Sequence, residues 1–353
     1  MNPSYRIVFY VSGHGFGHTS RVIEVIHAVL RARPDARIVV KTSAPHRLFA
    51  RTLQGRCEVV ELQCDAGIVQ IDSLNLDASE SVRQAVEFQR RLPALAEAEA
   101  AYLRGTETRL AVGDIPPLAV AAARAAGIPS VLIGNFTWDW IYEHYDGGAA
   151  LAKTIGKVYE QTTLALRFPM WGGFETMPRV QDIPLVARQS RRDPDEVRRA
   201  LGIPIDKRIA LTSFGGYGLD GLNEAALRSI EGYLVLLPGM IDERAMYDRG
   251  YRYEDLVRAV DVVVTKPGYG IISECIANDT ALLYTSRGDF REYQVLVDAM
   301  PAVMRCAFID HAGLFSGNWK PHLDALLAQP DPPVRPATNG AGVAADILLQ
   351  ILG

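Results

Sequence analysis

Two histidines stand inside a glycine-rich segment near the start of the chain, where a neutral imidazole could accept a proton from a substrate. Segment 12–18 reads S-G-H-G-F-G-H and separates a short apolar run from a longer amphipathic one, so His18 is predicted at the N-terminus of a helix. The dipole of such a helix favours the neutral form of an imidazole, which is the form that acts as a base. The alternative is that His18 only bonds to the loop backbone. His14 is a weaker candidate, for a structural role or for substrate contact, and the glycines that permit the turn and a close ligand approach are Gly13, Gly15 and Gly17.

The same segment departs from the dinucleotide-binding pattern G-x-G-x-x-G. His18 stands where that pattern requires glycine or alanine. The next apolar run ends in Lys41, Thr42 and Ser43, where a dinucleotide site would have an acidic residue for the ribose. The sequence therefore argues against an NAD-binding site.

A carboxylate follows another apolar run of the first half. Asp114 ends the run 109–113, and a side chain at that strand end points to the same edge of a parallel sheet as the His18 loop. Beside an imidazole, Asp114 would hold the ring in one tautomer and stabilise the imidazolium. Alternatively, Asp114 caps the helix that Pro116 opens.

The second half of the chain carries two glycine-rich turns after apolar runs. Segment 212–218 reads T-S-F-G-G-Y-G, and its N–H groups could form a nest for a diphosphate. Segment 265–270 reads T-K-P-G-Y-G and leads into a predicted helix, whose N-terminus suits phosphate. Glu274, predicted in the first turn of that helix, would accept hydrogen bonds from a ribose or only balance the helix dipole. The predicted donor-binding residues of these turns are Ser213, Phe214, Gly215, Gly216, Gly268, Tyr269, Gly270, Ser273 and Glu274.

Two further polar segments follow predicted strands. Segment 287–294, R-G-D-F-R-E-Y-Q, opens another helix in the second half and adds Arg291, Glu292 and Gln294 to the predicted donor site. In the first half, Trp138, Asp139 and Trp140 follow the apolar segment 134–137 and could line an acceptor pocket. The equally weighted alternative is that these aromatic side chains only pack in the core.

The elements that must position these residues alternate along the chain. Apolar runs at 6–11, 36–41, 59–62, 109–112 and 130–133 are predicted strands, and amphipathic segments 20–32, 45–53, 80–104 and 118–126 are predicted helices. The pattern restarts with strands at 209–212, 233–237, 262–265, 281–285 and 302–306 and helices at 222–230, 253–260, 271–278, 290–299 and 312–328. Such alternation predicts two α/β, doubly wound, Rossmann-like domains whose strand ends face a common cleft.

The predicted domains are 1–185, 186–336 and a C-terminal helix, 337–353, that packs back on the first domain. Between the halves, segment 183–204 is rich in arginine. It could bind an anion, but a solvated linker with a helix capped by Asp193 is favoured.

Composition narrows the classes of function. The net charge of −4 does not call for a nucleic acid or an anionic membrane as partner. The four cysteines form no C-x-x-C pair, so no disulfide framework or zinc site is expected. No apolar run reaches the roughly 20 residues of a membrane span and no signal peptide is evident, so a cytoplasmic protein is predicted.

The motifs together resemble one enzyme family. A strand, a glycine turn and S-E on a helix, followed by an acid- and glutamine-containing helix start, resemble the donor-binding half of GT-B glycosyltransferases. The chain is similar to the lipid II-forming N-acetylglucosaminyltransferase and UDP-glycosyltransferase superfamily, and more similar to the glycosyltransferase-like half of plant arabinokinases. The G-H-G-F-G-H loop and the closing segment 338–348, T-N-G-A-G-V-A-A-D-I-L, carry the latter resemblance.

This resemblance implies a role for each matching residue. His18 matches the general base that deprotonates the acceptor, Asp114 its aspartate partner, and Glu274 the ribose-binding glutamate. Glu292 and Gln294 match the pair that holds the donor sugar. The implied activity is an inverting transfer of a sugar from a nucleoside-diphosphate sugar, most simply a UDP-sugar, to a hydroxyl of a small-molecule or lipid-like acceptor. The nucleotide sugar is a co-substrate, and no other cofactor is expected.

The sequence also departs from the family pattern in several places, and two other functions stay open. The plant tryptophan-containing donor motif and the basic membrane-docking patch are absent, and no sugar-kinase segment follows, so arabinose phosphorylation is not expected. Metal independence is expected, because Asp193 and Asp195 lie in the linker and the chain has no D-x-D motif in the predicted cleft. The alternatives are a nucleotide-sugar 2-epimerase of the same fold and a non-catalytic nucleotide-sugar-binding protein.

Overall fold

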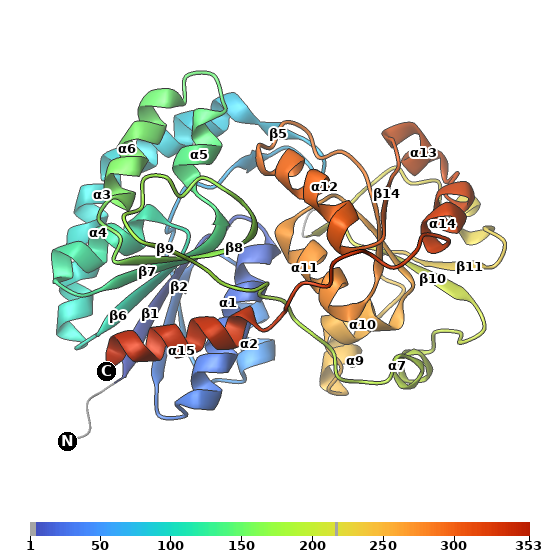
Figure 1. Cartoon of the computed structure of the whole chain (residues 1–353), viewed down its shortest axis with the longest axis horizontal. Coiled ribbons are helices and arrows are strands. Elements are labelled where there is room, and N and C mark those ends of the chain that lie inside the picture. The colour runs from blue at the N-terminus through green and yellow to red at the C-terminus, as the bar shows by residue number, and fades with distance from the viewer. Residues whose placement is uncertain (1–4, 216–217) are drawn as a thin grey trace.

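The computed structural model describes residues 5–215 and 218–353, which form two α/β units side by side (Figure 1). In the first unit, seven parallel strands are ordered β3-β2-β1-β6-β7-β8-β9. The strands are β1 (Arg6–Val11), β2 (Arg37–Thr42), β3 (Glu58–Glu61), β6 (Leu110–Asp114), β7 (Ser130–Phe136), β8 (Leu164–Gly172) and β9 (Val180–Asp182). The helices are α1 (Phe16–Ala32), α2 (His46–Leu53), α3 (Ala78–Gly105), α4 (Pro117–Ala126), α5 (Trp138–Glu143) and α6 (Ala149–Tyr159).

Both faces of this sheet are buried, which explains why its central strands are continuous apolar runs. In β1, Ile7 and Phe9 pack under α1, α2 and the last helix, whereas Val8 and Tyr10 pack under α3 to α6. The predicted strand and helix positions of this half agree with the structure to within a few residues. Strands β8 and β9, helices α5 and α6 and the short hairpin of β4 (Val69–Gln70) and β5 (Leu76–Asp77) were not predicted.

The second unit has five parallel strands in the order β11-β10-β12-β13-β14. They are β10 (Arg208–Thr212), β11 (Tyr233–Leu236), β12 (Val262–Thr265), β13 (Ala281–Tyr284) and β14 (Cys306–Phe308). The helices are α7 (Pro194–Leu201), α8 (Glu224–Arg228), α9 (Glu243–Asp248), α10 (Tyr253–Ala259), α11 (Tyr269–Asn278), α12 (Glu292–Val303), α13 (His311–Ser316) and α14 (Lys320–Leu327).

Two element predictions in this unit were wrong. The predicted strand 302–306 begins inside α12, because the apolar side chains of Leu296 and Met300 form a helical stripe that packs on the sheet and carries the helix on to Val303. Strand β14 begins only at Cys306. The predicted helix 312–328 is two helices, α13 and α14, separated by Gly317 in the left-handed conformation.

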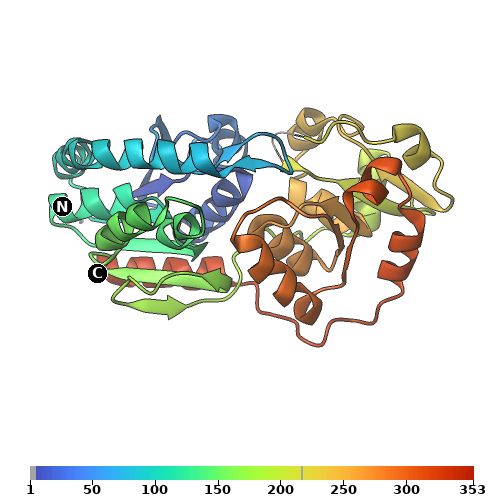
Figure 2. The same cartoon turned by 90° about the horizontal axis from the view of Figure 1, so that it is seen from above.

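The chain returns to the first unit at its end. Helix α15 (Gly340–Leu352) lies against α1 of the first unit (Figure 1). Four of its side chains enter the core under the first sheet: Ala344, Ala345, Leu348 and Leu352. Figure 2 shows the long helix α3 along one side of the first unit and α15 along the other. The linker helix α7 is capped by Asp193, whose side chain accepts a hydrogen bond from the N–H of Glu196. Among the described residues, no helix is both long and apolar enough to cross a membrane.

Candidate functional site

The two sheets bring their strand ends together, and the first residue placed there is His18. Helix α1 begins at Phe16, after Gly15 at a positive φ of 76°, so His18 lies in its first turn. The His18 Nδ1 lies 2.9 Å from Oδ1 of Asp114, the last residue of β6. Both side chains are buried. Helix α4 begins after Pro116 without a side-chain cap, so Asp114 faces the imidazole instead of capping that helix.

A buried arginine that no sequence motif had indicated completes this pair. Arg21 lies one turn after His18 on α1 and donates to both carboxylate oxygens of Asp114, from Nε to Oδ2 and from Nη2 to Oδ1, each at 2.5 Å. Burial alone would raise the pKa of Asp114, but attraction to Arg21 and His18 outweighs it and lowers the pKa. The carboxylate is therefore ionised at neutral pH. The i, i+3 spacing of His18 and Arg21 was a signal for this contact, because it puts both on one face of the helix.

The network continues from Arg21 into the second unit. Its Nη1 donates to Oδ1 of Asn135 at 2.7 Å, and Asn135 Nδ2 donates to Oε1 of Glu292 at 2.7 Å. The other oxygen of Glu292 accepts from Nη1 of Arg287 at 3.3 Å, and the same nitrogen donates to the carbonyl of Pro267. A continuous buried chain of polar contacts thus joins the imidazole to the predicted sugar-binding glutamate across the two units. Asn135 lies near the end of strand β7 much as Asp114 ends β6, and its position there could have selected it.

The two glycine loops also meet directly. A Cβ atom on Gly270 would lie 3.1 Å from Cα of Gly17, so the backbones of the two loops are in close contact at this point. A second contact joins the two units where Ser73 Oγ donates to the carbonyl of Phe214 at 2.9 Å. The predicted acceptor-side loop and the predicted donor-side loop are therefore neighbours, as strand ends that face a common cleft require.

The first donor turn after β10 is only partly described. Ser213 Oγ lies 2.5 Å from the hydroxyl of Tyr253, Phe214 is buried, and Gly215 has a positive φ of 75°. Gly216 lies outside the described residues. The described part is therefore an irregular turn in which Ser213 bonds to a tyrosine hydroxyl and Gly215 is exposed. Binding of a diphosphate by this turn stays a prediction.

The second donor turn leads directly into α11. Gly268 is the residue before the helix, and Ser273 Oγ bonds back to the carbonyl of Gly270 at 2.9 Å. The ring of Tyr269 is buried, with its centroid 5.4 Å from the Arg21 guanidinium carbon. Tyr269 thus supports the Arg21 network through a cation–π contact between the units.

Glu274 lies apart from this network. Because α11 begins at Tyr269, two residues earlier than predicted, Glu274 falls in the second turn and not in the first. Its Oε1 accepts from Arg188 at 2.7 Å from Nε and 2.6 Å from Nη2. Burial raises the pKa of Glu274, against the attraction of Arg188. Arg188 comes from segment 183–204 and is paired instead of solvated, so the prediction of a solvated linker is wrong at this residue.

The remaining donor-side residues separate into two groups. Glu292 belongs to the buried network, whereas Gln294 is exposed and bonds to Asp298 of its own helix at 2.6 Å. Arg291 reaches the first unit, donating to the carbonyl of Trp140 and to Glu143, the latter at 3.1 Å. The structure therefore brings together His18, Asp114 and Glu292 but does not bring Gln294 to them.

The acceptor-side residues are more enclosed than predicted. Trp138 is buried and its Nε1 donates to Oδ2 of Asp65 at 2.9 Å. Asp139 accepts from Thr176 at 2.8 Å, so its carboxylate serves the local fold. The Arg291 guanidinium carbon lies over Trp140, 4.5 Å from its ring centroid. Of the three, Trp138 lies beside the proposed base, with its ring centroid 6.4 Å from that of His18.

Two titratable side chains, Asp65 and His14, interact with His18. The Asp65 carboxylate also accepts from Ser12 Oγ at 3.0 Å, and its burial raises its pKa to about 6. The His14 ring stacks on Phe290 with ring centroids 6.0 Å apart, and burial, followed by repulsion from His18, lowers its pKa well below the usual value. His14 is therefore a neutral ring at physiological pH.

A lysine and an arginine, Lys266 and Arg287, lie at the donor turn. Burial and then repulsion from Arg287 lower the pKa of Lys266 to about 7. A bound anion would favour the charged form of Lys266. Within residues 5–215 and 218–353, no three His, Cys, Asp or Glu side chains are placed to hold a metal ion together.

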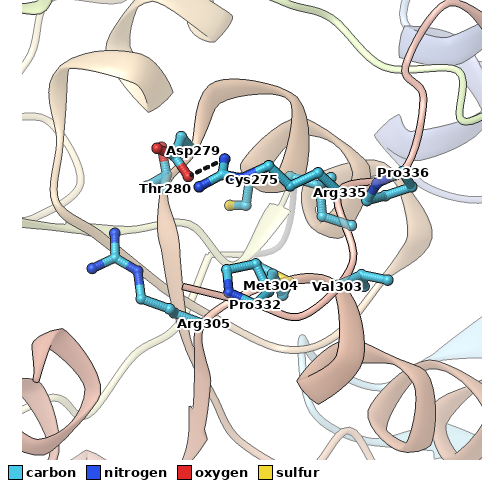
Figure 3. A pocket seen from close by; sticks show the side chains of 10 residues that line it. Cys275, Asp279, Thr280, Val303, Met304, Arg305, Pro332, Arg335 and Pro336 are labelled. Atoms are coloured by element: carbon cyan, nitrogen blue, oxygen red, sulfur yellow. Dashed lines mark hydrogen bonds and ion pairs between the residues drawn. The ribbon is translucent and has the colours of Figure 1, made fainter. Parts of the chain in front are cut away.

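A separate pocket lies outside the network in the second unit. Figure 3 shows it between α11 and the segment that follows α14, with Asp279 paired to Arg335 at 3.3 Å. The pocket is lined by Cys275, Ile276, Asp279, Thr280, Val303, Met304, Arg305, Pro332, Arg335 and Pro336. None of these residues belongs to the predicted site.

Comparison with curated proteins gives two relatives. The chain is 30% identical over 356 residues to the L-arabinokinase of Arabidopsis thaliana, covering 97% of this chain and 34% of that protein. It is 25% identical over 257 residues to an uncharacterized glycosyltransferase of Methanopyrus kandleri, covering 65% of this chain and 73% of that protein. The chain thus spans about a third of the length of the L-arabinokinase. No family model matches it.

Solved structures share the whole architecture at low identity. Medicago truncatula UGT71G1, solved with UDP-glucose, covers 100% of this chain at a TM-score of 0.62 and 11% identity, with 99% of that chain covered. The Acinetobacter baumannii MurG structure covers 99% of this chain at a TM-score of 0.52 and 12% identity, with 100% of that chain covered. These similarities confirm the fold class that the alternation of strands and helices predicted, and they confirm the resemblance to GT-B glycosyltransferases.

Proposed function

We propose, because this chain has the GT-B fold of glycosyltransferases, that it transfers a sugar from a nucleoside-diphosphate sugar to an acceptor hydroxyl. The observation that carries the proposal is the buried His18–Asp114 contact of 2.9 Å, beside the glycine turns of the second unit. A binding protein without catalysis would have no need of a base oriented by a carboxylate. The nucleotide is proposed to be UDP, since UGT71G1 was solved with UDP-glucose.

The proposed reaction begins with the imidazole. Asp114 accepts the Nδ1 proton of His18, which leaves Nε2 free to take the proton of the acceptor hydroxyl. The hydroxyl oxygen forms a bond to the anomeric carbon from the face opposite the diphosphate, and the carbon–oxygen bond to the diphosphate breaks. The anomeric configuration is inverted, and the nucleoside diphosphate leaves with the electron pair. Asp114 stabilises the imidazolium until the proton is released.

The leaving diphosphate is proposed to be stabilised without a metal. The start of α11 after Gly268 offers backbone N–H groups, and Arg287 offers positive charge at the same turn. Lys266 adds its charge once the anion is bound, because the anion favours protonation of the amine. Fixed donors and charges of this kind can replace a divalent cation. The contact of Gly17 with Gly270 supports this geometry, because it brings the base loop next to the proposed diphosphate turn.

The decisive experiment compares turnover with nucleotide binding. His18→Ala should lower kcat by about 10²–10⁴-fold while calorimetric binding of UDP is retained, because the nucleotide is held by the other unit. Asp114→Asn should also lower kcat, and the double variant should be little worse than His18→Ala alone. Turnover is followed as UDP release from a panel of UDP-sugars with candidate acceptors.

The control is His46→Ala, which changes an exposed histidine of α2 and should leave kcat unaltered. Near-normal turnover by His18→Ala would rule out the proposed base. Conversion of a UDP-sugar to its epimer in the absence of any acceptor would instead identify a 2-epimerase.

A further inference from the structure

A short hairpin of the first unit extends to the second unit from the N-terminal end of α3, and it is light blue in Figure 2. It consists of β4, β5 and the residues between them, and we call residues 72–75 its tip. Asp72 Oδ1 accepts hydrogen bonds from the N–H groups of Leu74 at 2.6 Å and of Asn75 at 2.9 Å. The aspartate therefore fixes the shape of the tip from within, independently of the unit against which the tip packs.

Two side chains of the tip are buried against the second unit. Leu74 is 4% exposed and belongs to the hydrophobic core of that unit, together with Phe214 and Leu314. Ser73 is also buried, and its Oγ donates to the carbonyl of Phe214 at 2.9 Å and lies within hydrogen-bond distance of the carbonyl of Gly218. Burial of a leucine stabilises more than one hydrogen bond does, so Leu74 contributes most to this docking.

The tip also touches a loop on the other side of the proposed diphosphate turn. A Cβ atom on Gly288 would lie 2.9 Å from the carbonyl oxygen of Leu74, so the two backbones are in close contact. Phe214 follows β10 and Gly288 follows β13, whereas the turn before α11 follows β12. The sheet order puts β12 between β10 and β13. The tip therefore spans the end of β12 and lies across the turn that we propose for the diphosphate.

The charge on Lys266 indicates the same position for the tip. Lys266 comes directly after β12, at the start of the proposed diphosphate turn. Burial and then repulsion from Arg287 lower the pKa of Lys266, and attraction to Asp72 acts in the opposite direction. The carboxylate of Asp72 is therefore near the amine of Lys266, as a tip that crosses this turn requires.

We propose that residues 72–75 form a latch that closes the first unit over the diphosphate turn, and that the nucleotide enters and leaves only while this latch is undocked. The inference rests on the proposed glycosyltransferase function and adds a step that controls the exchange of nucleotide. Strands β4 and β5 have two residues each, so few backbone hydrogen bonds oppose a movement of the hairpin. The tip can undock and dock again without a change in its own shape.

The first experiment measures access to the turn without any nucleotide. Lys266 is acetylated with the N-hydroxysuccinimide ester of acetic acid, and its rate is read by mass spectrometry relative to that of Lys153, an exposed lysine of α6. Leu74→Ala removes the buried side chain of the latch, so the undocked state is more populated and Lys266 should react about tenfold faster. Ile71→Ala changes a side chain of the same hairpin that is 66% exposed, and this matched control should leave the rate unchanged.

The second experiment measures how fast the nucleotide exchanges. Stopped-flow fluorescence with the N-methylanthraniloyl derivative of UDP gives the rate constants of association and dissociation. Leu74→Ala should raise both about tenfold, because undocking precedes entry and release alike. The latch docks in the free and in the bound protein, so Kd should stay within about threefold. Ser73→Ala should raise both rate constants about three- to fivefold, as for the loss of one hydrogen bond.

The outcomes separate a latch from a merely structural contact. Rates of acetylation and of exchange that equal those of Ile71→Ala would overturn the latch. Faster dissociation without faster association would also overturn it, because a contact that only holds the ligand acts on dissociation alone. A wild-type protein that does not bind UDP would end the proposed function, whereas the acetylation rates would still decide whether the tip controls access to the turn. Thermal melting identifies any misfolded variant, and Ser73→Ala is the second test if Leu74→Ala does not fold.

Discussion

At the scale of the residue, the most consequential feature is that Asp114 is shared between His18 and Arg21. A simple imidazole–carboxylate pair has one buried negative charge, whereas here two donors of one guanidinium already neutralise it. The arginine also orients Asn135. Removal of Arg21 would leave a buried carboxylate and a buried amide oxygen without their strongest partner.

The first prediction follows from that sharing. Arg21→Met should lower the free energy of unfolding by about 3–5 kcal/mol, the usual cost of leaving one partner of a buried pair. Arg21→Met combined with Asp114→Asn should recover part of that loss, because the uncompensated charge is gone. Urea unfolding at pH 7 measures both. Losses that simply add in the double variant would contradict an interaction between these two side chains.

The second prediction concerns Asp65, whose pKa is raised to about 6 by burial. Between about pH 4 and pH 6 the folded protein binds the carboxyl proton of Asp65 more tightly than the unfolded chain does. The protonated Asp65 therefore contributes to the free energy of unfolding below about pH 4, and this contribution is lost as the pH rises to about 6. A shift of roughly two units corresponds to about 3 kcal/mol. The unfolding free energy of Asp65→Asn minus that of the wild type should therefore rise by about 3 kcal/mol from pH 4 to pH 7 and then level off.

The matched control for this titration is Asp206→Asn, at an exposed aspartate in the second unit. Its difference from the wild type should stay flat over the same range of pH. If the Asp65→Asn difference were equally flat, Asp65 would not be the buried acid described here.

At the scale of the element, α15 ties the end of the chain to the first unit. Its first residue, Gly340, lies so close to the joining segment that a Cβ atom there would overlap the carbonyl oxygen of Pro184. The N–H of Gly340 donates to the carbonyl of Leu185 at 3.0 Å, and a bridge between Val186 and Asn339 lies beside it. The absence of a side chain at Gly340 is therefore what allows α15 to dock.

The third prediction compares two glycines of this helix. Gly340→Ala should cost about 1–3 kcal/mol of unfolding free energy, since backbone must move to admit the methyl group. Gly342→Ala adds the same atom where nothing lies within 4 Å, and should be neutral or stabilise the helix by up to about 1 kcal/mol. Urea unfolding of the two variants side by side is the measurement. Equal effects at both positions would show that the close approach of Pro184 is unimportant.

At the scale of the whole molecule, the two units touch through both apolar and polar contacts around the proposed site. Asp289 of the second unit bonds to His144 at 2.6 Å and, through its carbonyl, to Tyr145 at 3.0 Å. Arg291 and Ser73 add further bonds between the units. A ligand that contacts both units would therefore raise the free energy of unfolding of the whole chain and not of one unit alone.

The fourth prediction is that UDP stabilises the protein and that EDTA leaves this effect unchanged. At 100 times its Kd, UDP should raise the unfolding free energy by about 2.7 kcal/mol. No metal-binding cluster of His, Cys, Asp or Glu is present in the described residues, and the proposal gives the stabilisation of the diphosphate to Arg287, Lys266 and the start of α11. Thermal shift and turnover are measured with and without EDTA. Loss of either with EDTA and its recovery with magnesium or manganese would contradict metal-independent transfer.

The local pattern of the sequence determined most of the elements and their order. Apolar runs buried on both faces, such as β1 and β12, are typical of central strands in a sheet covered by helices, so the fold class followed from them. Because the carboxyl ends of parallel strands meet at one edge, the positions of His18 and Asp114 were also predictable. Strand β8 escaped prediction because Arg167 and Pro169 interrupt its apolar run, and proline is rare inside a sheet.

What only the tertiary structure decided is which side chains meet across the units. Asn135 and Glu292 are 157 residues apart, and the distance between their ends depends on how two sheets pack against each other. That packing is the sum of many weak contacts, none of which leaves a periodic trace in the chain. Arg21, likewise, is an ordinary helical arginine until β6 places Asp114 beside it. The periodicity of a sequence reports which face of an element is buried, whereas the partner of a buried polar group is chosen by the fold.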